Sequence, residues 1–93
     1  MDINKALGMS LKEIRQSKGL TQEDFSDISS RTYISDIERG VFKPTLFKID
    51  ELSKKLGIHP LTLITYAYTK VSKSSLEMIQ NTVKGEFPVK EQE

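Results

Sequence analysis

The sequence predicts an all-α chain built from short helices. Apolar residues recur at helical spacing along most of the chain, as in Leu7, Leu11 and Ile14, which lie at i, i+4 and i+7. No convincing run of residues alternates between apolar and polar, as a half-buried strand would. The five glycines and three prolines fall at plausible joints between helices. The expected architecture is therefore helix packed on helix.

Three helices are expected in the first part of the chain. The first covers about residues 4–17. A short second helix follows Thr21, whose hydroxyl can cap it, and acidic residues in its first turn favour the positive end of the helix dipole. The third helix is expected over residues 31–39, because Ser30 is a suitable cap and Gly40 a suitable C-terminal stop.

The remaining helices are marked by the same signals. Thr45 is expected to cap a fourth helix that ends at Gly57, and Pro60 suits the first position of a fifth. This fifth helix is expected to reach Thr69, where a polar stretch begins. A weaker amphipathic segment follows and ends at Gly85, and the charged tail from residue 86 is expected to be mobile.

Composition limits the function classes. Ninety-three residues make a single domain with little room for a second, and the absence of cysteine excludes disulfides, thiolate metal sites and thiol nucleophiles. The one histidine, His59, precedes a proline at a helix start, which favours a capping or surface role over metal binding. No carboxylate pair, phosphate-binding loop or nucleophile–base set is evident. We expect no enzyme, metal, cofactor or small-molecule ligand.

Charge and hydropathy point to a protein without membrane segments. The first ten residues lack a signal-peptide core, and the longest uncharged run, residues 58–69, is too short to span a bilayer, so a cytoplasmic protein is expected. The net charge is +1, and residues 1–44 contain seven basic and seven acidic residues. Any affinity for nucleic acid must therefore come from the placement of the cations rather than their number.

The predicted third helix has two distinct faces. Ile34, Ile37 and Glu38 share one face, which Val41 extends. The opposite face carries five hydrogen-bonding residues: Arg31, Thr32, Ser35, Asp36 and Arg39. Such a face can enter a major groove, where arginine bonds guanine and threonine bonds a base edge or touches a thymine methyl. Any solvated helix also carries such residues, so the short capped helix before it is what favours a helix-turn-helix.

Several short motifs carry a family resemblance. The segments, in order, are GLTQE at residues 19–23, YISDIERG at 33–40, PTL at 44–46 and LGI at 56–58. Together they resemble the phage-repressor/Cro-like helix-turn-helix family, also called the XRE family, over about residues 7–63. The resemblance implies a lambda-repressor-like five-helix DNA-binding domain in residues 1–69. Residues 70–93 would then form a short additional C-terminal helix and the charged tail.

The resemblance also implies roles for individual residues. The positions that match the family's base-reading residues are Arg31, Thr32 and Asp36, with Ser35 on the same face. The positions that match backbone contacts are Gln22, Tyr33, Arg39 and Lys43. Asp36 has two interpretations: it accepts a bond from cytosine N4, or it positions Arg39 or Lys43 without contacting a base.

Two charges are expected inside the domain. Arg15 shares the apolar face of the first helix and Glu38 that of the third, so the two are expected to pair, because an unpaired buried charge is very costly. The resemblance implies the same ion pair. In one respect the sequence departs from the family: the turn is about two residues shorter and lacks its usual glycine. Residues 28–30 must therefore turn the chain, and the second helix is expected to end early.

The expected function is that of a transcriptional regulator, a repressor or autoregulator, which binds a partly palindromic site on double-stranded DNA as a homodimer. The fifth helix is apolar on more than one face, and Leu76, Met78 and Ile79 can extend the dimer surface. Alternatively, the C-terminal segment folds back over its own chain. A rival function is a protein-interaction module that keeps the fold without reading DNA, which the near-neutral charge, Asp36 and the short turn favour.

Overall fold

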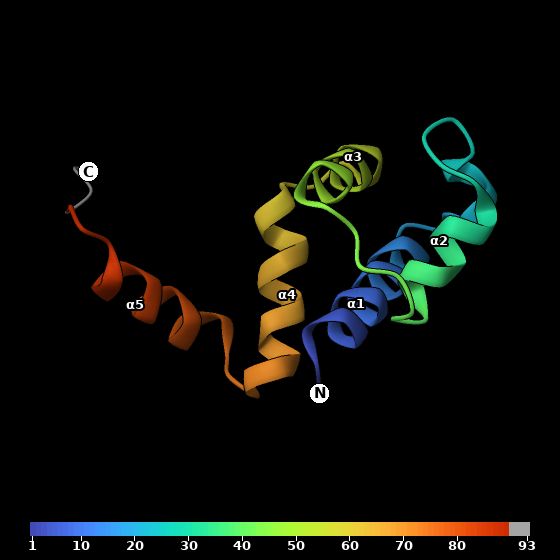
Figure 1. Ribbon diagram of the computed structural model, residues 1–93. Coiled ribbons are helices and arrows are strands. Elements are labelled where there is room, and N and C mark those ends of the chain that lie inside the picture. The colour runs from blue at the N-terminus through green and yellow to red at the C-terminus, as the bar shows by residue number, and fades with distance from the viewer. Residues whose placement is uncertain (90–93) are drawn as a thin grey trace.

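The computed structural model describes residues 1–89, which contain helices and no strand. Their order is α1 (Ile3–Ser17), η1 (Gln22–Phe25), α2 (Arg31–Glu38), α3 (Leu46–Leu56), α4 (Pro60–Ser72) and α5 (Leu76–Glu86), where η1 is a 3₁₀ helix. The first five elements pack together, and α5 extends away from them (Figure 1). The prediction of an all-α fold with five helices and an additional C-terminal helix is confirmed.

Local capping determines where these helices begin and end. The Thr45 hydroxyl accepts a hydrogen bond of 3.1 Å from the Lys48 N–H, and Gly57 ends α3 at a φ of 72°, in the left-handed region that favours glycine. The Leu61 N–H donates to Nδ1 of His59 at 3.0 Å, and Pro60 is the first residue of α4. The predicted bounds of α3 and the predicted start of α4 are confirmed.

The core forms around α1, which packs against α2 on one side and α4 on the other. Its buried apolar residues come from α1, η1, α2, α3 and α4: Ala6, Leu7, Leu11, Phe25, Ile34, Ile37, Ile49, Leu52, Leu56, Leu63 and Ala67. At Gly8 the backbones of α1 and α2 approach so closely that a Cβ atom would lie 2.3 Å from the carbonyl oxygen of Ile37. α2 therefore lies directly on α1.

The C-terminal helices differ from the prediction in length. α4 continues to Ser72 rather than ending at Thr69, and its last turn is tied to α1 by an ion pair of 2.8 Å between Lys70 and Glu13. The predicted domain boundary therefore falls inside α4, and the division into two parts stays a prediction. Gly85 does not end α5, which runs on to Glu86, because a single interior glycine costs a helix only about 1 kcal/mol.

The segment around α2 also differs in two details. The second helix is short and ends early, as expected, but it is a 3₁₀ helix of four residues, after which the chain turns through residues 26–29 to the Ser30 cap. Val41 is exposed rather than part of the inner face, because α2 ends at Glu38 and Gly40 turns the chain at a φ of 76°.

Within residues 1–89, no helix has the length and apolar character needed to cross a membrane. The last four residues of the tail that was expected to be mobile, 90–93, lie outside the described part of the chain.

Candidate nucleic-acid interface

The helix predicted to read DNA has one buried and one exposed face. The Ser30 hydroxyl starts α2 by accepting a hydrogen bond of 3.1 Å from the Tyr33 N–H. Ile34 and Ile37 are buried in the core, whereas Arg31 and Thr32 are exposed. The inner face therefore fixes the orientation of α2, and the outer face is open to a ligand.

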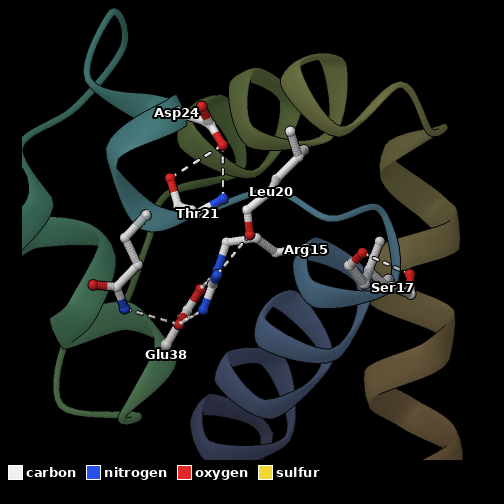
Figure 2. Close-up of polar contacts among 8 residues, drawn as sticks. Arg15, Ser17, Leu20, Thr21, Asp24 and Glu38 are labelled. Atoms are coloured by element: carbon white, nitrogen blue, oxygen red, sulfur yellow. Dashed lines mark hydrogen bonds and ion pairs between the residues drawn. The ribbon is translucent and has the colours of Figure 1, made fainter.

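A buried ion pair joins α2 to α1. Nε and Nη2 of Arg15 donate to the two carboxylate oxygens of Glu38 at 2.7 and 3.0 Å, and Nη1 donates to the carbonyl of Leu20 at 2.8 Å (Figure 2). Both side chains are almost inaccessible to solvent, at 8% and 4% exposure. Two parallel charge-assisted bonds constrain both distance and angle, so this contact restricts how α2 can tilt on α1.

Gln22 joins the same network. Its Nε2 donates to Glu38 at 3.0 Å, and the residue is half-buried at the start of η1. Glu38 thus receives hydrogen bonds from α1 and η1 while belonging to α2. Sequence reasoning did not foresee the contact between Gln22 and Glu38, because it depends on the path of the 3₁₀ turn. An amide nitrogen carries two hydrogens, so one donor of Gln22 remains for a further partner.

The start of η1 is held by Thr21 and Asp24. The N–H and the hydroxyl of Thr21 donate to the Asp24 carboxylate at 2.7 and 3.1 Å (Figure 2). The backbone hydrogen bond, followed by the hydroxyl bond, lowers the pKa of Asp24 below its ordinary value. This local clamp stabilises a helix that is too short to be stable by itself.

The exposed face of α2 carries its cations next to acidic neighbours. Arg31 lies 3.3 Å from the Glu23 carboxylate in an ion pair exposed on both sides. Arg39 pairs with the carboxylate of Asp36 one turn earlier. Ser35, which lies between Arg31 and Asp36 in the sequence, is half-buried. The face is thus polar and close to neutral. Arg31 has an exposed partner and Arg39 a half-buried one, and ion pairs at the surface contribute little to stability.

An aromatic contact extends the site beyond α2. The rings of Tyr33 and Phe42 lie 4.6 Å apart between centroids and are tilted by 56°, and Nζ of Lys48 lies 5.4 Å from the Tyr33 centroid. Lys43, next to Phe42, is exposed. Phe42 was not singled out from the sequence, since its role depends on how the loop after Gly40 folds back toward α2.

Comparison with known proteins gives consistent matches. A family model described as helix-turn-helix matches residues 11–63. An uncharacterized HTH-type transcriptional regulator of Sinorhizobium fredii, y4dJ, is 39% identical over 67 residues, which are 70% of this chain and 87% of the relative. The control protein C.BamHI of Bacillus amyloliquefaciens is 40% identical over 68 residues, covering 70% of this chain and 84% of that protein.

A solved structure agrees with the fold over nearly the whole chain. The clp gene regulator ClgR from Corynebacterium glutamicum superimposes with a TM-score of 0.73, covering 96% of this chain and 98% of the other, at 21% sequence identity. The family match covers the segment that contains η1, α2 and the buried ion pair. The chain therefore belongs to the phage-repressor/Cro-like (XRE) family of helix-turn-helix transcriptional regulators.

Proposed function

We propose that this regulator binds a partly palindromic operator in double-stranded DNA as a homodimer, in the cytoplasm, and acts as a repressor or autoregulator. One observation carries the proposal: α2 exposes a polar face while a buried ion pair fixes the helix on α1. A rigid helix with an open polar face suits insertion into a major groove, and dimers of such domains read two half-sites about one helical turn apart. The similarity to a named control protein supports a regulatory role.

Arg31 and Thr32 are the proposed base readers. Both are exposed in the first turn of α2, the part of a recognition helix that contacts base edges. Arg31 is held only by its exposed pair with Glu23, and a guanine can displace so weak a partner. Thr32 has no charge and can bond a base edge or contact a thymine methyl.

Gln22, Tyr33, Arg39 and Lys43 are the proposed phosphate contacts. Gln22 keeps one amide hydrogen free of Glu38 for a phosphate oxygen. The contact with Phe42 holds the ring of Tyr33 in place, and Lys43, the residue after Phe42, is exposed in the loop. Phosphate contacts of this kind fix the register of the protein on the duplex and carry no sequence information.

Asp36 is proposed as a positioning residue rather than a base reader. Its carboxylate pairs with Arg39, and its backbone carbonyl accepts a hydrogen bond of 3.0 Å from the Val41 N–H. Because the Asp36 carboxylate is already paired with the Arg39 guanidinium, we do not expect it to accept a hydrogen bond from cytosine. Ser35 is half-buried next to Asp36. Because its side chain is short, its hydroxyl can bond only a phosphate or base edge that approaches closely.

Salt titration of binding to a mixed pool of duplex DNA tests this function against the protein-interaction module. The protein-interaction module is favoured by the ion pairs of Arg31 with Glu23 and of Arg39 with Asp36, because they leave the exposed face of α2 close to neutral. A DNA-binding protein loses affinity steeply as salt rises, with a slope of about −0.9 for each phosphate contacted. Lys43→Ala is expected to reduce that slope by about one. Absence of DNA binding at low salt would instead support the module.

A further inference from the structure

α5 is a helix that the rest of its own chain does not cover. None of its eleven residues is buried, yet Leu76, Ile79, Val83 and the following Phe87 lie on one face. In Figure 1, α5 diverges from α4 and joins the other helices only through its N-terminal end. A helix of this length is marginal in water alone, so its apolar face needs a surface to pack on.

The space beside α5 is a groove of about 1300 Å³. One wall is formed by α1 and α4, where Ile14, Leu61 and Tyr66 lie among polar residues, and the other wall is formed by the apolar face of α5. Leu61 is 60% exposed although it is a leucine in the first turn of a packed helix. The surface of the groove is thus more apolar than polar, and the groove is open to solvent.

We propose that α5 of a second copy of this chain fills the groove, and that the two copies exchange these helices reciprocally. This inference rests on the homodimer in the proposed function and names the surface that forms it. Each copy has the same groove and the same helix, so a single two-fold axis can place the α5 of each copy in the groove of the other. The exchange covers the apolar residues of both walls, which include the apolar face of α5.

The dimensions support a second α5 as the occupant. An eleven-residue helix is about 16 Å long and about 10 Å wide, which corresponds to roughly 1300 Å³, the volume of the groove. The large, exposed apolar side chains that line the groove are Leu61, Tyr66, Leu76 and Val83, followed by Phe87 and Val89.

The link between α4 and α5 leads α5 away from α4, which forms part of the other wall of the groove. Lys73 adopts a φ of 52°, a left-handed conformation uncommon for a residue with a side chain, and this turn directs α5 away from α4. In Figure 1, α5 and α2 lie at opposite ends of the molecule. A partner seated in the groove therefore leaves the exposed face of α2 free for DNA.

The first test measures the dissociation constant of the dimer by sedimentation of the full chain without DNA. Val83→Asp puts a charge on the docking face and is expected to raise that constant at least tenfold, because a carboxylate in an apolar interface loses its water. Met78→Asp is the matched control: Met78 is also an exposed apolar residue but lies on the other side of α5, and its substitution is expected to leave the constant within twofold. Equal effects of the two variants would overturn the proposal.

The second test uses the absence of cysteine from the chain. Single variants Val83→Cys and Leu61→Cys, carrying tags of different mass, are mixed and oxidised. Helix exchange predicts a mixed disulfide between the two copies, and Met78→Cys in place of Val83→Cys is expected to give little. Equal yields from positions 78 and 83, or no mixed disulfide at all, would overturn the exchange even if the variants disturb stability.

The two proposals fail in different ways. A dimer that resists Val83→Asp but still selects a palindromic DNA site overturns helix exchange and leaves the regulatory function standing. A dimer that is disrupted by Val83→Asp but selects no DNA site supports helix exchange and overturns the DNA-binding function.

Discussion

At the scale of single residues, the contact between Arg15 and Glu38 has the largest energetic consequence. Both charges are removed from water, and each is satisfied by the other, by the carbonyl of Leu20 or by the amide of Gln22. Truncating either residue leaves the other charge buried without its partner. The same pair holds α2 at a fixed angle on α1, so its loss affects the site as well as stability.

Arg15→Met and Glu38→Leu are each expected to lower the free energy of unfolding by about 3–5 kcal/mol, as measured by urea denaturation. The double variant is expected to be less destabilised than the sum of the two, because it buries no lone charge. Single losses below about 1 kcal/mol would show that the pair is not buried in solution.

Gly8 is a second residue whose substitution has a geometric consequence. A Cβ at this position would lie 2.3 Å from the Ile37 carbonyl oxygen, so Gly8→Ala must push α2 away from α1. It is expected to lower the free energy of unfolding by about 1–3 kcal/mol, as overpacking of a core does. Gly85→Ala is the matched control, since it too lies inside a helix but meets nothing within 4 Å. It is expected to stabilise by about 0.5–1 kcal/mol. Thermal unfolding distinguishes the two, and equal effects would contradict the close helix contact.

At the scale of elements, η1 depends on one carboxylate. Because hydrogen bonds from Thr21 lower the pKa of Asp24, the charged form stabilises the fold above the ordinary pKa of the carboxyl, and this contribution is lost as pH falls through the lowered pKa. Wild type is therefore expected to unfold at a higher temperature than Asp24→Asn at pH 7, with the difference disappearing in acid. Glu77→Gln, which removes an exposed carboxylate from α5, serves as the control. A difference that does not change with pH would contradict this role.

The elements also show what sequence can and cannot predict. The ends of α3 and the start of α4 were predictable, because caps such as Thr45, Gly57 and Pro60 act on their own neighbours. Sequence did not predict the 3₁₀ form of η1 or the continuation of α4 past Thr69. The extra turn of α4 is accompanied by an ion pair between Lys70 and Glu13, two residues that are far apart in the sequence.

The same distinction holds within the site. The meeting of Arg15 and Glu38 could be inferred from two opposite charges on inward faces. The contacts of Gln22 with Glu38 and of Tyr33 with Phe42 could not, because each depends on the path of a turn or loop rather than on a periodic pattern.

At the scale of the whole molecule, the charge is close to balanced, and the two proposed surfaces lie apart. A net charge of +1 gives little general attraction to DNA, so affinity must come from the placement of cations around α2 and from the use of two copies. α5, which forms one wall of the groove, lies at the opposite end of the molecule from α2 (Figure 1). Dimer formation and DNA contact can therefore occur together.

Selection of bound sequences from random duplex DNA tests the central claim most directly. The wild type is expected to enrich a partly palindromic motif, and Arg31→Ala is expected to relax one position in each half-site, at a cost of about 1–3 kcal/mol in discrimination. Enrichment of no motif by the wild type would contradict sequence-specific DNA binding, and enrichment of the same motif with the same strength by Arg31→Ala would contradict the assignment of Arg31 as a base reader.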